Sequence, residues 1–214
     1  MGTEILEQLK RAVIEYDSDG AASLAKKAVD EKVDALEVMS ALTEAIRQVG
    51  DGFAEGKLWL PELVAAANAM QVATPILEEE IRKTGAKRET LGSAVVGTVF
   101  GDIHSIGKAM VCTLLTAEGF EVHDLGVNVK VEDFVAAVKN YEPDILAMSA
   151  LLTSTALLQR RVITALKEAG IRDKVKIMVG GAAITEEFAG KIGADGYDPT
   201  APGAARLARV LVGK

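Results

Sequence analysis

The sequence predicts an α/β protein in which an N-terminal four-helix bundle precedes a five-stranded parallel sheet. Apolar residues recur at helical spacing as far as about residue 88. Beyond that point apolar runs alternate with helical patterns, which is typical of a parallel, doubly wound sheet. The first of these runs, "SAVVGTVF" (93–100), is continuous and rich in Val, as expected of a strand buried on both faces.

The first part of the chain is interpreted as four helices with short connections, a small bundle. They are expected over residues 3–16, 21–31, 34–56 and 60–85. The segment "DSDG" is expected to stop the first helix. The third is expected to begin near Asp34, whose spacing to Glu37 resembles a capping box. In the fourth, Pro61 suits the first turn and Pro75 predicts a kink.

A charged stretch, "RKTGAKRET" (82–90), is interpreted as a linker, after which strands and helices alternate. Strands are expected over residues 93–100, 120–126, 143–151, 173–181 and 193–198, and longer helices over 105–119, 131–142, 154–170 and 202–214. In such sheets ligands bind at the carboxyl ends of strands, beside the topological switch point. The candidate site therefore combines "GDIHSIGK", "SALLTST", "VGG" and "YDPTA".

Composition excludes several classes of function. The net charge of −7 gives no electrostatic reason to expect nucleic acid or an acidic membrane as partner. The N-terminus does not resemble a signal peptide, and no apolar stretch approaches the length of a membrane span, so a cytoplasmic protein is expected. Cys112 is the only cysteine, which excludes a disulfide framework, and we interpret it as a core residue. His123 matches no motif and is interpreted as structural.

Asp102 and His104 form an Asp-x-His pair on the loop after the first predicted strand. A carboxylate at this spacing can orient an imidazole that binds a metal. The pair is equally compatible with an ordinary surface contact, and the neighbouring glycines with a phosphate at a helix N-terminus. However, "GDIHSIG" is not the dinucleotide-binding pattern G-x-G-x-x-G. The pair alone leaves these alternatives open.

The spacing between loops carries a resemblance to a known family. After Asp-x-His-x-x-Gly, 41 residues (108–148) precede Ser149-x-Leu151, and a further 28 (152–179) precede Gly180-Gly181. This arrangement resembles the cobalamin-binding domain of corrinoid methyltransferases and mutases. The helical stretch "GDGFAEGKLWLPELVAAANAM" is similar to the cap module of the same proteins.

End to end, the chain resembles the corrinoid methyl-carrier proteins of methanol, methylamine and O-demethylase methyltransferase systems. It is also similar to the cap and cobalamin-binding modules of cobalamin-dependent methionine synthase. The resemblance implies a helical cap domain over residues 1–88 and a Rossmann-like (flavodoxin-like) cobalamin-binding domain over 89–214. It also implies a hinge near residues 84–92.

The resemblance assigns roles to matching residues. His104 would be the lower axial ligand of cobalt, Asp102 would hold its other nitrogen and exchange a proton, and Thr155 would extend this relay. Ser105 departs from the acidic residue that is frequent in relatives. The implied cofactor-binding residues are Gly101, Asp102, Ile103, His104, Ser105, Ile106, Gly107, Ser149, Leu151, Thr153, Gly180, Gly181, Tyr197 and Ala201, with Phe53, Trp59 and Leu60 over the upper face.

Plainer interpretations of some of these residues stay open. Ser149 could only cap the following helix, Gly180-Gly181 could be only a tight turn, and Phe53 and Leu60 could be ordinary bundle core. Two glycines, Gly52 and Gly56, precede Trp59 and favour an exposed turn in a chain with only 4% aromatic residues.

The implied cofactor is cobalamin or a related cobamide in the base-off/His-on form, alternating between cob(I)amide and methylcobamide. The protein would not be catalytic alone. It would carry a methyl group from a substrate-specific methyltransferase to an acceptor methyltransferase that uses tetrahydrofolate or a thiol such as coenzyme M, with a reductive activase as further partner. The alternatives are a cobalamin-sensing regulatory module and a flavodoxin-like or receiver domain.

Overall fold

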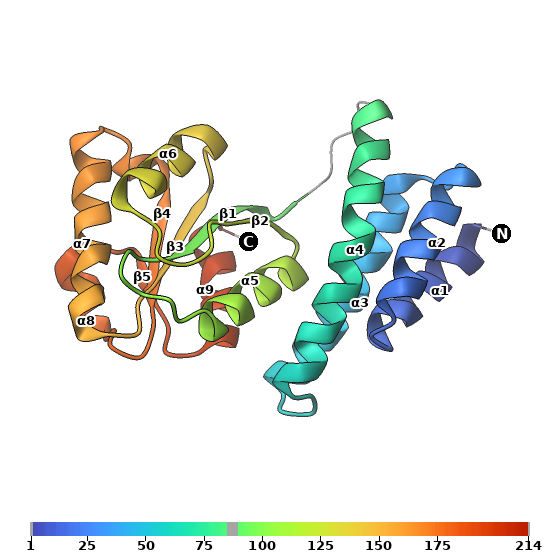
Figure 1. Ribbon diagram of the computed structural model, residues 1–214, viewed down its shortest axis with the longest axis horizontal. Helices are drawn as coiled ribbons and strands as arrows, with labels where there is room; N and C mark the ends of the chain where they lie inside the picture. The colour runs from blue at the N-terminus through green and yellow to red at the C-terminus, as the bar shows by residue number, and fades with distance from the viewer. Residues whose placement is uncertain (1, 85–89, 214) are drawn as a thin grey trace. The chain divides into compact units, whose positions relative to one another are not determined.

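The structure is a computed structural model that describes residues 2–84 and 90–213. Its chain divides into two compact units, one built from four helices and one that begins at Thr90 (Figure 1). The expected domain boundary between residues 88 and 89, and the larger part of the expected linker and hinge, lie outside the described residues.

The first unit consists of α1 (Gly2–Ile14), α2 (Ser18–Asp30), α3 (Ala35–Ala54) and α4 (Leu60–Thr84). Each helix buries one aliphatic stripe, and α2 does so almost entirely with alanine, at Ala21, Ala25 and Ala28. Small side chains let helix axes approach closely. This explains how a bundle with few aromatic residues fills its core.

Two local expectations for this unit were wrong. The segment "DSDG" does not lie between two helices, because Asp17 is the N-cap of α2 and accepts a hydrogen bond from Gly20 N at 2.9 Å. At α3, Asp34 is the N-cap as expected, but its carboxylate accepts from Leu36 N rather than from the third residue of the helix. Helix α4 continues through Pro75 to Thr84, so the first residues of the expected linker are helical.

The second unit alternates strands and helices throughout. Its strands are β1 (Gly92–Thr98), β2 (Phe120–Asp124), β3 (Ile145–Ser149), β4 (Lys176–Gly180) and β5 (Gly196–Tyr197). Its helices are α5 (Ile106–Glu118), α6 (Val131–Tyr141), α7 (Thr153–Glu168), α8 (Glu186–Ile192) and α9 (Ala201–Leu211), with a 3₁₀ turn at Arg172–Lys174. All strand pairs are parallel, in the order β2-β1-β3-β4-β5.

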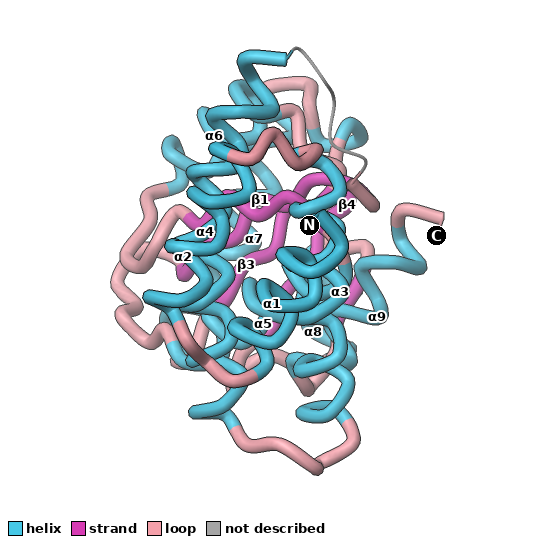
Figure 2. Tube along the Cα trace, turned by 90° about the vertical axis from the view of Figure 1, so that its right-hand side faces the viewer, coloured by secondary structure: helices cyan, strands magenta, loops and turns pink. Residues whose placement is uncertain are grey.

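Helices cover both faces of this sheet (Figure 2). Apolar side chains of α6, α7 and α8 pack on one face around Leu146 and Ile177, and those of α5 and α9 pack on the other around Ile145 and Met178. At Gly97 in β1 an added Cβ would lie 2.8 Å from the Phe134 ring, so the absence of a side chain lets α6 approach the sheet. The predicted doubly wound α/β architecture is confirmed.

The strand order places the topological switch point between β1 and β3. From β1 the chain passes to β2 on one side, and β3 pairs with β1 on the other. Thr98, Ser149 and Gly180 lie in one row across β1, β3 and β4, at the carboxyl ends of these strands. The loops that follow them therefore meet at one edge of the sheet. Within residues 2–84 and 90–213, no helix is long and apolar enough to cross a membrane.

Candidate functional site

The loop after β1 turns sharply before α5 begins. Gly101 has a φ of +79°, a conformation that glycine adopts without strain. This turn sends the Asp102 side chain into the protein, where only 1% of the residue is exposed, and leaves half of the His104 side chain accessible. The buried Thr98 hydroxyl donates a hydrogen bond to the His104 carbonyl at 3.1 Å. The loop thus presents an imidazole at the surface and hides the carboxylate that supports it.

The Asp102 carboxylate accepts four hydrogen bonds. Its Oδ1 lies 2.7 Å from His104 Nδ1 and 3.0 Å from His104 N. Its Oδ2 accepts from Leu151 N and from the Thr155 hydroxyl, each at 2.8 Å. Two bonds on each oxygen use the full acceptor capacity of an ionised carboxylate. Asp102 thereby joins the loop after β1 to the loop after β3 and to the first turn of α7.

These bonds determine the protonation of the pair. Burial alone would raise the pKa of Asp102, but hydrogen bonds from the backbone N–H groups of His104 and Leu151, and from the His104 and Thr155 side chains, together hold its pKa well below its usual range. An ionised carboxylate can only accept, so the proton of a neutral His104 imidazole lies on Nδ1. The lone pair of Nε2 is then available to a ligand.

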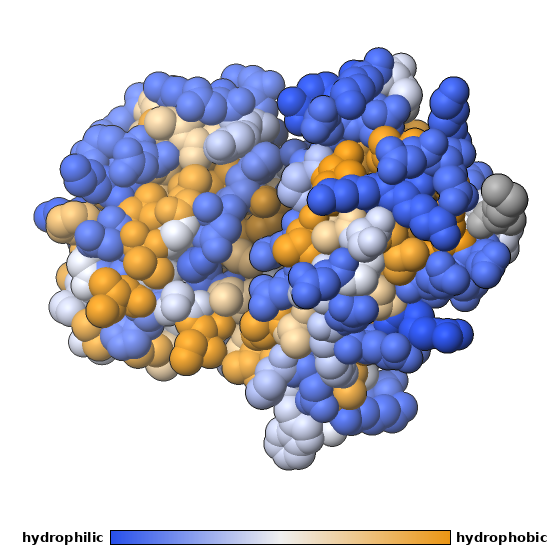
Figure 3. All heavy atoms as spheres, turned by 45° about the vertical axis from the view of Figure 1, so that its right-hand side comes forward, coloured by the Kyte–Doolittle hydropathy of each residue, from blue (hydrophilic) through white to orange (hydrophobic). Residues whose placement is uncertain are grey.

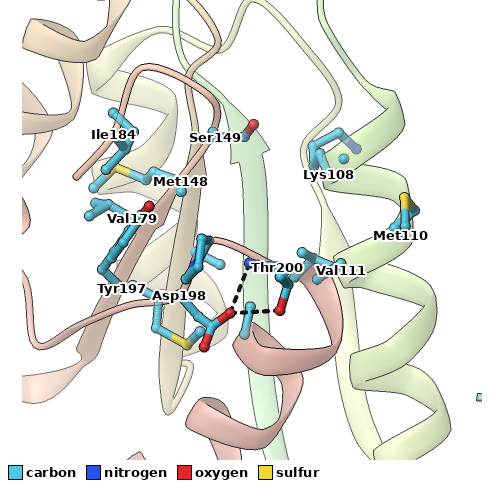
Figure 4. A pocket seen from close by; sticks show the side chains of 18 of the residues that line it. Lys108, Met110, Val111, Met148, Ser149, Val179, Ile184, Tyr197, Asp198 and Thr200 are labelled. Atoms are coloured by element: carbon cyan, nitrogen blue, oxygen red, sulfur yellow. Dashed lines mark hydrogen bonds between the residues drawn. The ribbon is translucent and has the colours of Figure 1, made fainter. Parts of the chain in front are cut away.

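A cavity of about 590 Å³ opens beside this pair, within the second unit (Figure 4). Helix α5 contributes Lys108, Met110 and Val111 to its wall, and the carboxyl ends of β3 and β4 contribute Ser149 and Val179. Most of the lining is apolar. A volume of this size suits a small organic molecule or a substantial part of a larger cofactor.

The cavity brings together about half of the residues expected at the site. His104, Gly107, Ser149, Leu151, Gly180, Gly181, Tyr197 and Ala201 line it. Asp102 and Thr155 lie behind His104 and are buried. Gly101, Ile103, Ser105, Ile106 and Thr153 do not line the cavity, and all five are exposed. Ile103 and Ile106 are 74% and 70% exposed, which is unusual for large aliphatic residues.

Glycine occupies the adjacent positions 180 and 181 for different structural reasons. Gly181 has a φ of +119°, and a Cβ there would lie 1.9 Å from the Ala150 carbonyl oxygen, so the chain itself requires glycine. At Gly180 a Cβ would meet nothing within 4 Å, and the space beside it is open. The close approach of a ligand can therefore explain Gly180, whereas Gly181 is explained by the packing of two loops.

Two polar pairs beside the cavity contain residues of the expected loops that the sequence did not single out. Lys108 lies one helical turn beyond His104 and forms an ion pair with Asp124 at the end of β2. Asp198 Oδ1 accepts hydrogen bonds from both the N–H and the hydroxyl of Thr200, each at 2.8 Å (Figure 4). The i,i+4 spacing from His104 could have indicated Lys108. The "DPT" segment before a predicted helix could have indicated the second pair.

The three expected cap residues lie around one turn of the first unit. Phe53 is near the end of α3 and half-buried, Trp59 precedes α4 and is 74% exposed, and Leu60 is the first residue of α4. Glu62 accepts a hydrogen bond from Trp59 N at 2.5 Å, and Leu58 packs over Gly52. This turn therefore has a defined conformation that exposes its indole.

His123, the second histidine of the chain, has a structural environment on the edge strand β2. Its ring stacks on that of Tyr141 with centroids 4.0 Å apart, and its Nε2 lies 3.4 Å from Glu121 Oε1. It does not line the cavity. These contacts occupy one ring face and one nitrogen of His123.

Comparison with known proteins gives matches over both units. Two family models, each described as a B12 binding domain, match residues 5–78 and 92–206. A corrinoid protein of Desulfitobacterium hafniense (strain Y51) is 44% identical, over 98% of each chain. Trimethylamine corrinoid protein 1 of Methanosarcina acetivorans is 42% identical, over 92% of each chain. A chain of the methanol:cobalamin methyltransferase complex from Methanosarcina barkeri has a TM-score of 0.88 and 29% identity, covering 98% of this chain and 80% of that one.

Proposed function

Because the chain belongs to the family of B12-binding corrinoid proteins, we propose that it carries a methyl group on cobalt between two methyltransferases. The observation that carries this proposal is the pair formed by His104 and buried Asp102 at the mouth of a large cavity. One methyltransferase would be specific for a donor such as a methylamine or methanol. The other would pass the methyl group to tetrahydrofolate or to a thiol such as coenzyme M.

The residues of the site fit a corrinoid in the base-off/His-on form. A corrin supplies the equatorial ligands of its cobalt, so the protein needs to offer a single axial nitrogen. The His104 side chain is half exposed, and its Nδ1 is engaged by Asp102, which leaves Nε2 as the nitrogen to offer. The open space beside Gly107 and Gly180 would be filled by a side chain at either position, which supports a close approach of the cofactor there. We propose that the cavity receives the nucleotide tail and that His104 replaces its base on cobalt.

The exposed apolar residues beside His104 support the same assignment. Phe100, Ile103, Ile106, Leu151 and Leu152 all follow the carboxyl ends of β1 and β3, and between 37% and 74% of each is exposed. On the face that Figure 3 presents, orange apolar areas lie among hydrophilic residues. Contact with the apolar edge and methyl groups of a corrin would remove such side chains from water. We therefore assign to them the lower face of the macrocycle.

When bound, the cobamide supplies a cobalt centre that accepts and releases a methyl group. The chain tunes this centre through the proton it holds on His104 Nδ1. With Asp102 ionised, the Nδ1–H···Oδ1 bond increases the electron donation of the imidazole. When Oδ2 of Asp102 is protonated, its O–H can donate a hydrogen bond to the Thr155 hydroxyl, which then turns its own proton to the Leu152 carbonyl, 3.0 Å away. Donation by the imidazole then weakens.

The helical unit would cover the upper face of the corrin with Phe53, Trp59 and Leu60. An apolar cover excludes water from the reactive metal. Because Trp59 is the only tryptophan of the chain, its fluorescence reports on this assignment. Titration of the apoprotein with cobalamin is expected to quench the emission, and emission unchanged at saturating cobalamin would contradict the role of Trp59.

Methyl loading tests the proposed function directly. The full chain is reconstituted with cobalamin, reduced to cobalt(I) and mixed with iodomethane under anaerobic conditions. One methyl group per protein is expected to become bound, and a thiol methyltransferase of a methylamine system is expected to remove it. A holoprotein that is methylated no faster than free cobalamin, and is not demethylated by methyltransferases of either the folate or the thiol class, would contradict the proposal.

A further inference from the structure

The backbone of the loop that carries Asp102 and His104 is held at its turn by Asn128. Asn128 follows β2, in the segment that leads to α6. Its side-chain Oδ1 accepts a hydrogen bond from Gly101 N at 2.8 Å, and its own N–H donates to the Asp102 carbonyl at 2.9 Å. Asn128 therefore binds the two peptide groups that flank the Gly101–Asp102 peptide, whose own N–H donates to the Val99 carbonyl at 3.2 Å.

The backbone conformation of Asn128 makes this double contact possible. Its φ of +56° lies in the left-handed region, which Asn tolerates better than most non-glycine residues. On either side, Gly126 O accepts from Thr98 N, and Val129 N donates to Thr98 O. The segment 126–129 thus continues the ladder of β1 beyond its last residue and places Asn128 opposite the turn at Gly101.

The contacts of Asn128 fix the backbone at the point where the loop turns. Gly101, with a φ of +79°, is the residue at which the chain reverses, and its N–H is directed to Asn128 rather than to a strand. A shift of the backbone of Gly101 and Asp102 would move the Asp102 carboxylate away from its four donors and the His104 ring with it. The orientation of the imidazole consequently depends on Asn128 together with the partners of the carboxylate.

We propose that Asn128 is a positioning residue for the axial ligand, holding Gly101 N–H and the Asp102 carbonyl so that His104 presents Nε2 toward the corrin. This inference rests on the proposed role of His104 as the cobalt ligand. Asn128 touches neither the cavity nor the imidazole, so it acts entirely through the loop.

Three variants separate the side-chain contact from the backbone conformation. Asn128→Gly keeps the left-handed conformation without strain and removes only the Oδ1 acceptor. Asn128→Asp restores an acceptor of the same length. Asn128→Ser keeps an oxygen that is one atom too short to reach Gly101 N, and it serves as the second test should the glycine variant fold poorly. Glu142→Gly is the matched control, because Glu142 is also left-handed (φ +44°) but ends α6.

The first measurement uses the apoprotein, through amide hydrogen exchange followed by NMR. In Asn128→Gly and Asn128→Ser we expect exchange of the Gly101 amide to accelerate about fivefold, the effect of losing one ordinary hydrogen bond. In Asn128→Asp and Glu142→Gly we expect the wild-type rate.

The second measurement uses the full chain reconstituted with cobalamin and reduced to cobalt(II). In protein labelled with ¹⁵N in histidine alone, electron paramagnetic resonance reports the fraction of cobalt whose axial nitrogen comes from histidine. We expect the equilibrium between His-bound and His-free cobalt to shift about three- to tenfold toward His-free in Asn128→Gly and Asn128→Ser, with recovery in Asn128→Asp and no change in Glu142→Gly.

An axial-nitrogen signal as large in Asn128→Gly and Asn128→Ser as in the wild type would overturn the positioning role while leaving His104 as the ligand. A wild-type holoprotein without an axial nitrogen from labelled histidine would instead contradict the assignment of His104, and the present inference with it. The two failures are therefore distinguished by the wild-type spectrum alone.

Discussion

The Thr155 hydroxyl lies 2.8 Å from Asp102 Oδ2 and 3.0 Å from the carbonyl oxygen of Leu152. A hydroxyl has one proton, so Thr155 donates it either to the carboxylate or to the helix N-cap carbonyl. The first arrangement suits an ionised Asp102, and the second suits a protonated one. The residue thus has two hydrogen-bonded states available without any movement of the backbone.

Thr155→Val removes this donor while conserving shape. We expect the pKa of Asp102 to rise, because one of the bonds that stabilise the ionised form is lost. The free energy of unfolding at pH 7 should fall by about 1.5–3 kcal/mol, the usual value for a hydrogen bond to a charged group. Urea denaturation measures the change, with Thr155→Ser as the control that retains the hydroxyl. Equal losses in the Val and Ser variants would show that the hydroxyl contributes nothing.

Asp102→Asn tests the pH dependence that follows from the lowered pKa of Asp102. Because the folded-state pKa lies below the ordinary value of 3.8, ionised Asp102 stabilises the fold above pH 3.8, and this contribution is lost as the pH falls further. The stability difference between wild type and variant should be constant between pH 5 and 7 and shrink below pH 4. Denaturation at a series of pH values measures it, and a difference independent of pH down to 3 would refute the assignment.

Alanine at the two adjacent glycines should have opposite consequences. Gly181→Ala places a Cβ against the Ala150 carbonyl in a conformation with positive φ, so we expect a loss of more than about 3 kcal/mol of stability. Gly180→Ala meets open space, so the melting temperature of the apoprotein should change little while cobalamin affinity falls. Calorimetry and equilibrium dialysis measure the two effects. Full cobalamin affinity in a stable Gly180→Ala protein would contradict the role given to Gly180.

The single thiol should be unreactive in the folded protein. Burial, followed by the nearby negative charge of Asp124, raises the pKa of Cys112 from 9.0 to about 12. At pH 8 the thiolate fraction should therefore be lower than that of an exposed cysteine by a factor of about 1,000, and alkylation correspondingly slow. Iodoacetamide labelling followed by mass spectrometry checks this, and the urea-unfolded chain is the positive control. Rapid labelling of the native protein would show that the thiol is accessible and ionisable.

The periodicity of the sequence predicted the architecture because strands and helices here are long and regular. The apolar run before "GDIHSIGK" and the alternation after it were sufficient to place the loops of Gly101, Ser149 and Gly180 at one edge of the sheet. The periodicity does not indicate the start of α2 because Asp17 acts as a cap four residues before the first apolar position of the helix, Ala21. A polar segment between helices was therefore interpreted as a break.

The site itself was only partly predictable. The Asp-x-His spacing indicated a contact between Asp102 and His104, because two residues on one short loop can meet without knowledge of the fold. Asn128 could not be found in this way, since its contact with Gly101 joins two loops 27 residues apart and depends on the register of β1 with the segment after β2. Likewise, the clash of a Gly181 side chain with Ala150 exists only once β3 and β4 are paired.

The central claim is that His104 is the cobalt ligand. The origin of the axial nitrogen can be measured directly, because the chain contains only two histidines, His104 and His123. The protein is labelled with ¹⁵N in histidine alone, reconstituted with unlabelled cobalamin and reduced to cobalt(II). We predict that the superhyperfine triplet of an axial ¹⁴N becomes the doublet of ¹⁵N in wild type and in His123→Asn, and disappears in His104→Ala. A triplet that persists in the labelled wild-type protein would show that the cofactor's own base remains on cobalt, which would contradict the account.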